Sequence, residues 1–152
     1  MRKVLSRAAY PAAVLALFSL DRLTKSWAIH SLQPHGEIPL LPFFSLTYVE
    51  NTGIAFGMFR GRNSPLVLLS VFLILGLLWW RRRIPGTARL AHWAVILVVA
   101  GAVGNLYDRI VYGCVVDFLD FKVWPVFNVA DSCITVGACL LALSLLRAPS
   151  NP

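Results

Sequence analysis

The sequence predicts an all-α polytopic membrane protein with four transmembrane helices and a small extracytoplasmic β-hairpin, or cradle, between the first two. Three observations support this fold class. Of the 152 residues, 58% are hydrophobic and only 14% are charged, and the mean hydropathy is +0.71. Soluble domains carry about a quarter charged residues, and a core this small cannot bury so much apolar surface. The excess must therefore face lipid.

Four segments have the length to cross a bilayer, at residues of about 8–29, 65–80, 90–106 and 126–146. Each is near the roughly 20 residues that a hydrocarbon core requires, and the second is the shortest. Ser64 can cap the second segment, and Pro65 suits its first helical position. Ile-Pro-Gly at residues 84–86 predicts a tight turn before the third segment. We expect residues 1–152 to form a single membrane domain.

The first segment has a second interpretation, as a cleaved signal peptide, because Arg2 and Lys3 precede its apolar run. Asp21, Arg22 and Lys25 follow that run, and there is no small-residue cleavage site of the usual kind. We therefore expect the segment to be retained as a helix.

Charge predicts the orientation of the helices. The basic residues that flank one set of helix ends are Arg2, Lys3, Arg7, Arg81, Arg82, Arg83, Arg89 and Arg147, and all seven acidic residues fall toward the other side. Basic residues mark the cytoplasmic side of bacterial inner membranes. We expect both termini in the cytoplasm of a bacterial cell. A nucleic-acid partner explains the net charge of +7 poorly, since the basic residues are split between short loops.

The loop between the first two helices has strand character. Residues 44–49 alternate polar and apolar side chains, residues 54–59 are again apolar, and Glu-Asn-Thr-Gly at 50–53 separates them. This pattern predicts a β-hairpin with one apolar face on the membrane surface. Residues 110–125, between the third and fourth helices, have the same character.

Charged residues of three helices have similar predicted depths. Counted from the cytoplasmic arginine of each helix at about 1.5 Å per residue, Asp108 and Asp131 lie roughly 28 and 24 Å above the cytoplasmic edge. Lys25 and Asp21 reach roughly 27 and 21 Å by the same count. A charged group in a bilayer costs at least a few kcal/mol. Several at one level therefore indicate a common purpose.

Spacing along each helix supports this convergence. Asn105, Asp108 and Arg109 are three and four residues apart, so they share a helix face. Asn128 and Asp131 form a matching face at the start of the fourth segment.

Two neighbouring carboxylates favour one kind of chemistry. Their like charges raise the pKa of one member, so the pair holds a single proton near neutrality. The ionised member then takes a proton from water while the protonated member polarises a carbonyl. This aspartic-protease mechanism needs no metal and no cofactor. The sequence contains no HExxH, GxSxG or GxGD motif, and its three cysteines have no metal-binding spacing.

Five motifs in chain order resemble those of bacterial lipoprotein signal peptidase, or signal peptidase II. They are DRLTK at 21–25, ENTGIAFG at 50–57, AGAVGNLYDR at 100–109, VVDF at 115–118 and FNVADS at 127–132. Each motif alone is weak, but five in the family's order are highly specific. Ile54, Ala100 and Tyr107 depart from the family's usual residues, and none of them is a proposed catalytic group.

The resemblance implies a membrane aspartyl endopeptidase that removes the signal peptide from diacylglyceryl-modified prolipoproteins by cutting before the lipidated cysteine. Carried over by motif, Asp108 and Asp131 would be the catalytic pair. The substrate-binding or supporting positions would be Asp21, Lys25, Asn51, Gly53, Asn105, Arg109 and Asn128. The family is also the target of cyclic peptide antibiotics such as globomycin, which occupy the same site. We expect a monomer in contact with membrane lipids, its active site near the extracytoplasmic face, because four helices can enclose this site within one chain.

Structural roles stay open for the same residues. Asp131 and Asn128 are residue types that cap helices, and Asp108 with Arg109 could form an interfacial ion pair. We interpret Asp117 and Asp120 as solvated loop residues.

Two other classes of protein compete with the peptidase. A proton-coupled transporter also carries intramembrane acids and bases, but it requires polar residues down to the cytoplasmic side, where HWAVILVV and CLLALSLL are almost wholly apolar. A non-catalytic scaffold has no use for two carboxylates at one depth, and it should tolerate substitution of either.

Overall fold

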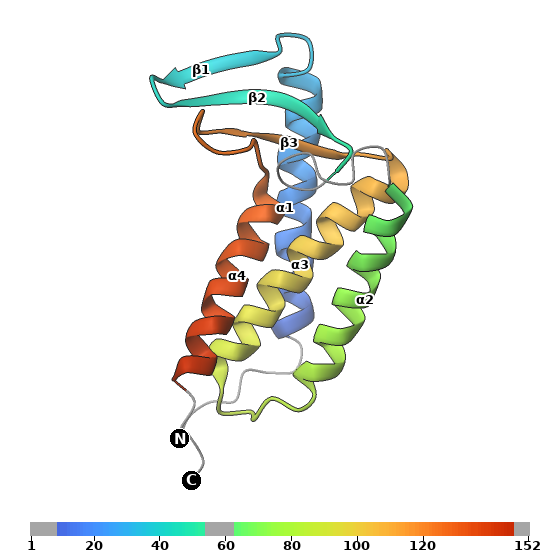
Figure 1. Ribbon diagram of the computed structural model, residues 1–152, viewed down its shortest axis with the longest axis vertical. Coiled ribbons are helices and arrows are strands. Elements are labelled where there is room, and N and C mark those ends of the chain that lie inside the picture. The colour runs from blue at the N-terminus through green and yellow to red at the C-terminus, as the bar shows by residue number, and fades with distance from the viewer. Residues whose placement is uncertain (1–8, 54–62, 148–152) are drawn as a thin grey trace.

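The structure, a computed structural model, describes residues 9–53 and 63–147. Four helices form a bundle, and a three-stranded sheet lies across one end of it (Figure 1). In chain order the elements are α1 (Ala9–Ser31), β1 (Glu37–Leu41), β2 (Phe44–Asn51), α2 (Asn63–Arg81), α3 (Arg89–Val111), β3 (Val115–Asp120) and α4 (Val129–Leu146). The predicted combination of four helices with a small sheet is present among these residues.

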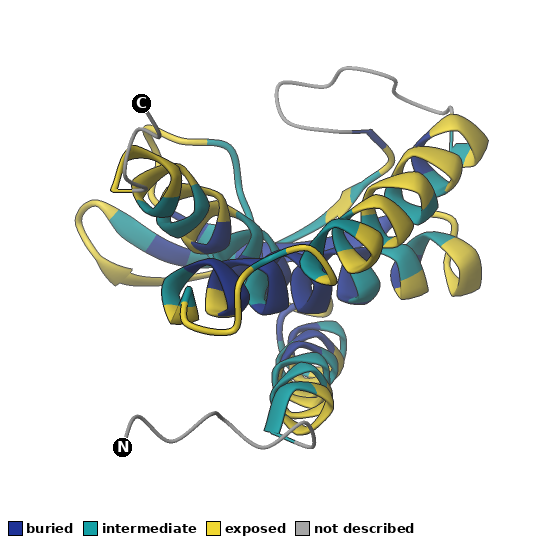
Figure 2. Ribbon diagram, turned by 90° about the horizontal axis from the view of Figure 1, so that it is seen from below, coloured by how far each residue is buried: buried dark blue, intermediate teal, exposed yellow. Residues whose placement is uncertain are grey.

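Three of the helices are long and apolar enough to cross a membrane, namely α2, α3 and α4. The remaining long helix, α1, carries Asp21, Arg22 and Lys25. The central helix is α3, whose most apolar window is 67% buried, against 6% for α2 and 11% for α4. Figure 2 shows the buried residues concentrated along this helix, with the others around it. The outer helices therefore present apolar side chains outward, as helices in lipid do.

The helix ends differ from the predicted positions for local reasons. The third helix continues past residue 106 to Val111, and Gly113 follows it with a positive φ of 75°. The fourth helix begins at Val129 instead of 126, because Phe127 pairs with Leu119 of β3 and Asn128 is the N-cap.

The predicted strand at residues 44–49 is present within β2, but its hairpin partner is β1. β1 and β2 form the hairpin, and β2 then pairs antiparallel with β3. Glu50 and Asn51 were expected in a turn, but they are the last residues of β2 and pair with Val116 and Val115. The expected second strand at 54–59, the residues Ile54, Arg60 and Arg62, and the basic residues Arg2, Lys3 and Arg7 lie outside the described residues.

Small residues let the helices approach closely around α3. An added Cβ at Gly137 would lie 2.8 Å from the Ala94 carbonyl oxygen, and one at Gly101 would collide with the Ala130 carbonyl oxygen. Such contacts need glycine, as at many helix interfaces in membranes. Close packing of α3 against α4 fixes how the start of α4 faces α3.

A small apolar core joins the sheet to the bundle. Ala28 and Leu32, in and just after the last turn of α1, pack with Val116 and Phe118 of β3, and each is 4% exposed or less. This core holds β3 beside the upper part of α1, and β3 lies above the upper ends of α3 and α4 (Figure 1). The intervening residue Asp117 has the opposite side-chain direction along the strand.

Candidate active site

Buried polar side chains gather where the helices meet the sheet. Six of them are 5% exposed or less, and these are Asp21, Lys25, Asn105, Asp108, Asp117 and Asn128. Asp131 stands beside them at the start of α4. The structure therefore brings together residues from α1, α3, β3 and α4, and most of the predicted supporting residues are joined by hydrogen bonds or ion pairs.

Four of these residues form an ion cluster between α1 and α3. Lys25 Nζ lies 2.8 Å from Asp108 Oδ2 and 3.1 Å from Asp21 Oδ2. Arg22 donates to Asp21 Oδ2 at 2.6 Å and also to Asp108 Oδ1. Two carboxylates are thus matched by two cations. Each oxygen of Asp108 contacts a cation.

Arg22 is a site residue that the sequence analysis did not single out. Its guanidinium lies over the rings of Phe18 and Tyr107, with distances to the ring centres of 5.8 and 4.8 Å. A Cβ at Gly104 would come within 2.7 Å of Asp21 Oδ2, so a glycine keeps room for the cluster. The only signal for Arg22 was its place inside the DRLTK motif.

Asn128 links the two acidic residues on the other side of the site. Its Oδ1 accepts from the backbone N–H of Asp131 at 2.8 Å, which makes it the N-cap of α4. Its Nδ2 donates to Asp117 Oδ1 at 2.6 Å. Asn105 Nδ2 donates to Asp131 Oδ1 at 2.7 Å, and Asn105 Oδ1 accepts from Lys25 at 2.9 Å. The cap that the sequence left open is therefore present, and it also orients both carboxylates.

Asp117 is buried within the site, so its interpretation as a solvated loop residue is wrong. It is 1% exposed, and its Oδ2 accepts from Asn51 Nδ2 at 2.9 Å. Burial, followed by the nearby negative charge of Asp131, raises the pKa of Asp117 to about 7, against the opposing effect of hydrogen bonds from Asn51 and Asn128. Its hydrogen-bond donors are neutral amides, in contrast to the cations around Asp108.

Asp120 is also buried, at 8% exposure, and belongs to a separate polar group on the sheet. It accepts from Thr47 Oγ1 at 2.9 Å and lies 3.0 Å from Lys122 Nζ. Lys122 in turn lies 2.7 Å from Glu37 on β1. These contacts join β1, β2 and the end of β3, and we assign them to the sheet.

Arg109 supplies positive charge to the second pair of acids. Among the acids, its electrostatic attraction is strongest to Asp131 and next strongest to Asp117. The ion pairs of Asp108, by contrast, are made by Arg22 and Lys25. The Arg109 side chain also donates to the Gly53 carbonyl at 3.2 Å. Gly53 N–H donates to Asn51 Oδ1 at 3.0 Å, so the end of β2 is tied to the site from two directions.

The site therefore contains two acidic pairs with different surroundings. Asp21 and Asp108 face Arg22 and Lys25, and their charges cancel. Asp117 and Asp131 repel each other and share the field of Arg109, so one shared proton would make this part neutral. Acidic pairs whose surroundings separate their pKa values are suited to acid–base catalysis.

A sequence model of the family described as signal peptidase (SPase) II matches residues 13–147. Proteins named lipoprotein signal peptidase from Clostridium novyi and Pelotomaculum thermopropionicum are 42% and 43% identical to this chain. The first alignment covers 84% of this chain and 90% of the relative, and the second covers 88% and 89%.

Solved structures agree with these sequence matches. One described as a bacterial membrane enzyme is 25% identical, covers 100% of this chain and 98% of its own, and superposes with a TM-score of 0.89. Together with the apolar helices, this likeness identifies a multi-pass membrane protein. The chain belongs to the signal peptidase II family of membrane peptidases.

Proposed function

We propose that this protein is an aspartic endopeptidase that cuts diacylglyceryl-modified prolipoproteins before the lipidated cysteine. Family membership and relatives named lipoprotein signal peptidase support the substrate class. The observation that carries the mechanism is the mutually repelling pair formed by the buried Asp117 and the half-buried Asp131.

The catalytic pair in this proposal is Asp117 with Asp131. The sequence-based pairing of Asp108 with Asp131 stays a prediction, but the contacts of Asp108 argue against it. An attacking water needs a carboxylate oxygen that can accept its proton, and both oxygens of Asp108 bind Arg22 or Lys25. Asp117 binds only amides, and its raised pKa suits proton transfer near neutrality.

The reaction then follows from a pair that holds one proton. The ionised carboxylate takes a proton from water as the water oxygen bonds to the scissile carbonyl carbon, and the protonated carboxyl donates to the carbonyl oxygen. A proton next passes to the amide nitrogen and the C–N bond breaks. The products are the signal peptide's new carboxyl group and the free amine of the lipidated cysteine. The proton belongs to the pair and is not assigned to either Asp117 or Asp131.

The remaining predicted residues support this pair. Asn105 and Asn128 orient the carboxylates by hydrogen bonds, and Lys25 holds Asn105. Asp21 Oδ1 accepts from the backbone N–H of Ala130, so the ion cluster also fixes the start of α4. We propose that Asn51, at the end of β2, helps to position the substrate backbone.

Gly53 and Arg109 complete the supporting set. We propose that residues 51–53, at the end of β2, position the extended peptide beside the acids. The Gly53 carbonyl accepts a hydrogen bond from Arg109, which holds this segment in place. The Arg109 charge would stabilise the negative charge that develops during attack.

We further propose that all four helices cross the inner membrane, with both termini in the cytoplasm and the site near the extracytoplasmic face. The ion cluster supports a membrane position for α1, because its charged residues are paired with each other and with Asp108. The chain would act as a monomer, with lipid tails of the substrate lying among the helices. Cyclic peptide inhibitors such as globomycin would occupy the same site.

The test is cleavage of a diacylglyceryl-modified prolipoprotein by purified protein in lipid. We expect Asp117→Asn and Asp131→Asn to lower kcat by at least about 10²-fold, the usual contribution of a general acid or base. Asp120→Asn is the matched control, since Asp120 is a buried acid of the same strand outside the site. Folding of every variant is checked by thermal melting.

Asp108→Asn decides between the two candidate pairs. Inactive Asp108→Asn together with active Asp117→Asn, both folded, would make Asp108 the partner of Asp131. If wild-type protein leaves the lipidated substrate uncut under conditions in which a relative cuts it, the proposed function is wrong.

A further inference from the structure

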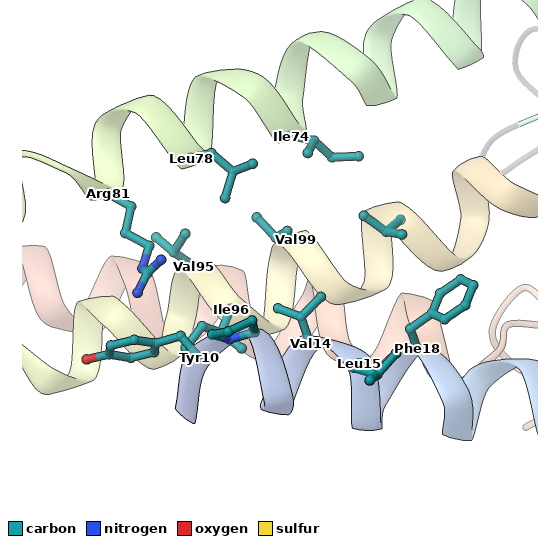
Figure 3. A pocket seen from close by; sticks show the side chains of 12 residues that line it. Tyr10, Val14, Leu15, Phe18, Ile74, Leu78, Arg81, Val95, Ile96 and Val99 are labelled. Carbon is teal, nitrogen blue, oxygen red and sulfur yellow. The ribbon is translucent and has the colours of Figure 1, made fainter. Parts of the chain in front are cut away.

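An apolar cavity of about 460 Å³ lies between α1, α2 and α3, and it runs from Tyr10 and Arg81 up to Phe18 and Val103. Figure 3 shows Val14 and Phe18 of α1, Ile74 and Leu78 of α2, and Val95 and Val99 of α3 pointing toward this space. Its lining is aliphatic and aromatic, apart from Tyr10 and Arg81 at one end.

The length of the cavity matches one membrane leaflet. On α3 the cavity wall extends to Val103, and the polar residue at the far end is His92. Eleven residues of α-helix span about 16 Å at 1.5 Å each. Half of a bilayer's hydrocarbon core is about 15 Å thick. The cavity therefore accommodates an acyl chain within the leaflet on the α2–α3 turn side.

The end of the cavity at the α2–α3 turn is polar and basic. A second cavity of about 580 Å³ shares Tyr10, Leu78 and Arg81 with the first and adds Arg82 and His92. The Arg81 guanidinium lies 4.2 Å from the centre of the Tyr10 ring. The two cavities adjoin at these shared residues, so a basic compartment lies next to the apolar one.

Two buried nitrogen atoms in this basic compartment have no hydrogen-bond partner within the part of the chain that the structure describes. They are Arg81 Nε and His92 Nδ1. The His92 side chain is only 8% exposed, so this ring nitrogen is removed from bulk water. Buried polar atoms are normally hydrogen-bonded, and one without a partner calls for an explanation. A ligand with anionic oxygens would supply acceptors to the Arg81 guanidinium. His92 already shares a hydrogen bond with the Pro85 backbone, so its unpaired Nδ1 is suited to accept from a ligand hydroxyl.

We infer that this double cavity binds one anionic phospholipid of the cytoplasmic leaflet. The phosphate would contact Arg81 and Arg82, a headgroup hydroxyl would donate to His92, and one acyl chain would lie between the three helices. The inference rests on the membrane orientation proposed above, but not on the peptidase mechanism. The basic cavity lies at the α2–α3 turn, the opposite end of the bundle from the sheet that carries Asp117 (Figure 1), so the phosphate site is distinct from the acidic site.

Native mass spectrometry of the purified protein in detergent tests this site. Phosphatidylglycerol and phosphatidylcholine with identical acyl chains are titrated separately, and inorganic phosphate is added as a competitor. We expect one tightly bound phosphatidylglycerol, weaker phosphatidylcholine binding and no displacement by phosphate. The double variant Arg81→Gln/Arg82→Gln should weaken phosphatidylglycerol binding by about fivefold per arginine.

Two further variants separate the site from general membrane charge. Arg83→Gln removes the same charge from the next residue, which lies over the Trp79 ring outside both cavities, and should bind lipid as wild type does. Val99→Trp fills the apolar cavity and should reduce binding without a change of charge. Asp131→Asn should bind phosphatidylglycerol normally, which keeps this result independent of cleavage.

Three outcomes would overturn the inference. The first is equal phosphatidylglycerol affinity in wild type and in the double arginine variant. The second is equal affinity for the two phospholipids. The third is displacement of bound lipid by a synthetic signal-peptide helix, which would assign the cavity to the substrate.

Discussion

At the scale of single residues, Asp108 and Asp117 show how neighbours determine the role of a carboxylate. Both are buried, at 0% and 1% exposure. The backbone N–H of Val116, the residue before Asp117 on β3, donates to Asp108 Oδ2 at 3.4 Å. Asp108 is ion-paired with Lys25 and Arg22. Asp117 receives hydrogen bonds from Asn51 and Asn128, which stabilise its charge less. The charge of the neighbouring groups, and not the degree of burial, therefore distinguishes Asp108 from Asp117.

The raised pKa of Asp117 predicts a pH dependence of stability. Its carboxyl ionises at about 7 in the folded protein, against an ordinary value of 3.8. Between these pH values the folded protein holds a proton that the unfolded chain releases, so the free energy of unfolding falls as pH rises. The full loss is on the order of 4 kcal/mol. Asp117→Asn should remove this contribution and raise stability above pH 7 relative to wild type, as measured by melting in detergent from pH 5 to 8.

Asp120→Asn is the control for this experiment. Burial raises the pKa of Asp120, but hydrogen bonds from the backbone and side chain of Lys122 outweigh it and hold the pKa below its usual value. This variant should keep the wild-type loss of stability between pH 5 and 7. If Asp117→Asn kept that loss as well, the proton would reside elsewhere in the site.

Asn128 combines a cap with a catalytic support, and the two can be separated by substitution. Asn128→Ala removes the cap and leaves Asp117 with one donor fewer, so we expect a loss of about 2 kcal/mol in stability. Serine is also a good cap, but its shorter side chain does not reach Asp117. Asn128→Ser should therefore keep most of the stability while kcat falls by about 10-fold or more. Equal activity of Asn128→Ser and wild type would reduce Asn128 to a cap.

At the scale of elements, the fold depends on how closely α3 is approached by its neighbours. Gly104 leaves room for the Asp21 carboxylate, and Gly137 brings α4 against the Ala94 backbone. Only the central helix has most of its surface covered, while α2 and α4 remain largely exposed to the surroundings. Movement of α3 would therefore displace Asn105 and both acidic pairs together.

Two helical glycines give a matched test of this packing. At Gly137 an added Cβ would come within 2.8 Å of Ala94 O and 2.9 Å of Val98 N, while at Gly76 it would meet nothing within 4 Å. Gly137→Ala should cost about 1–3 kcal/mol through overpacking. Gly76→Ala should be neutral or stabilise by up to about 1 kcal/mol through helix propensity. Thermal melting of both variants decides this, and an equal effect would remove the packing argument.

The sequence could predict the helices and the meeting of their polar residues, because apolar length and the depth of a charge follow from local counting. It could not predict that Asp117 is buried. That property depends on the pairing of β3 with β2, in which Asp117 lies opposite Val49 from a distant part of the chain. The distinction between Asp108 and Asp117 also depends on where the Arg22 side chain points, and no local sequence pattern determines that direction. Local counting therefore predicted which residues meet, while the proposed partner of Asp131 depends on contacts that only the structure shows.

At the scale of the whole molecule, charge is separated along the bundle axis. Arg81, Arg82, Arg83 and Arg89 lie in or beside the α2–α3 turn at one end, and the sheet with Glu37, Glu50, Asp117 and Asp120 covers the other (Figure 1). Between these ends the charges of α1 and α3 are paired within the ion cluster. Such a separation orients helices with the basic end in the cytoplasm. The orientation proposed above would therefore place Asp117 and Asp131 where a secreted prolipoprotein presents its lipidated cysteine.

Two exposed positions test this orientation in intact cells. Val123 follows β3 and is 93% exposed, and Gly86 lies in the α2–α3 turn with open space around its Cα. Because the basic turn should lie in the cytoplasm, a membrane-impermeant maleimide should label Val123→Cys in spheroplasts and Gly86→Cys only after permeabilisation. Cys139 is exposed and is replaced by serine in both proteins, whereas Cys114 and Cys133 are buried and serve as an internal background. Labelling of Gly86→Cys in sealed spheroplasts would show that the orientation is the reverse of the proposed one. The acidic site would then lie on the cytoplasmic side and the basic cavity in the outer leaflet.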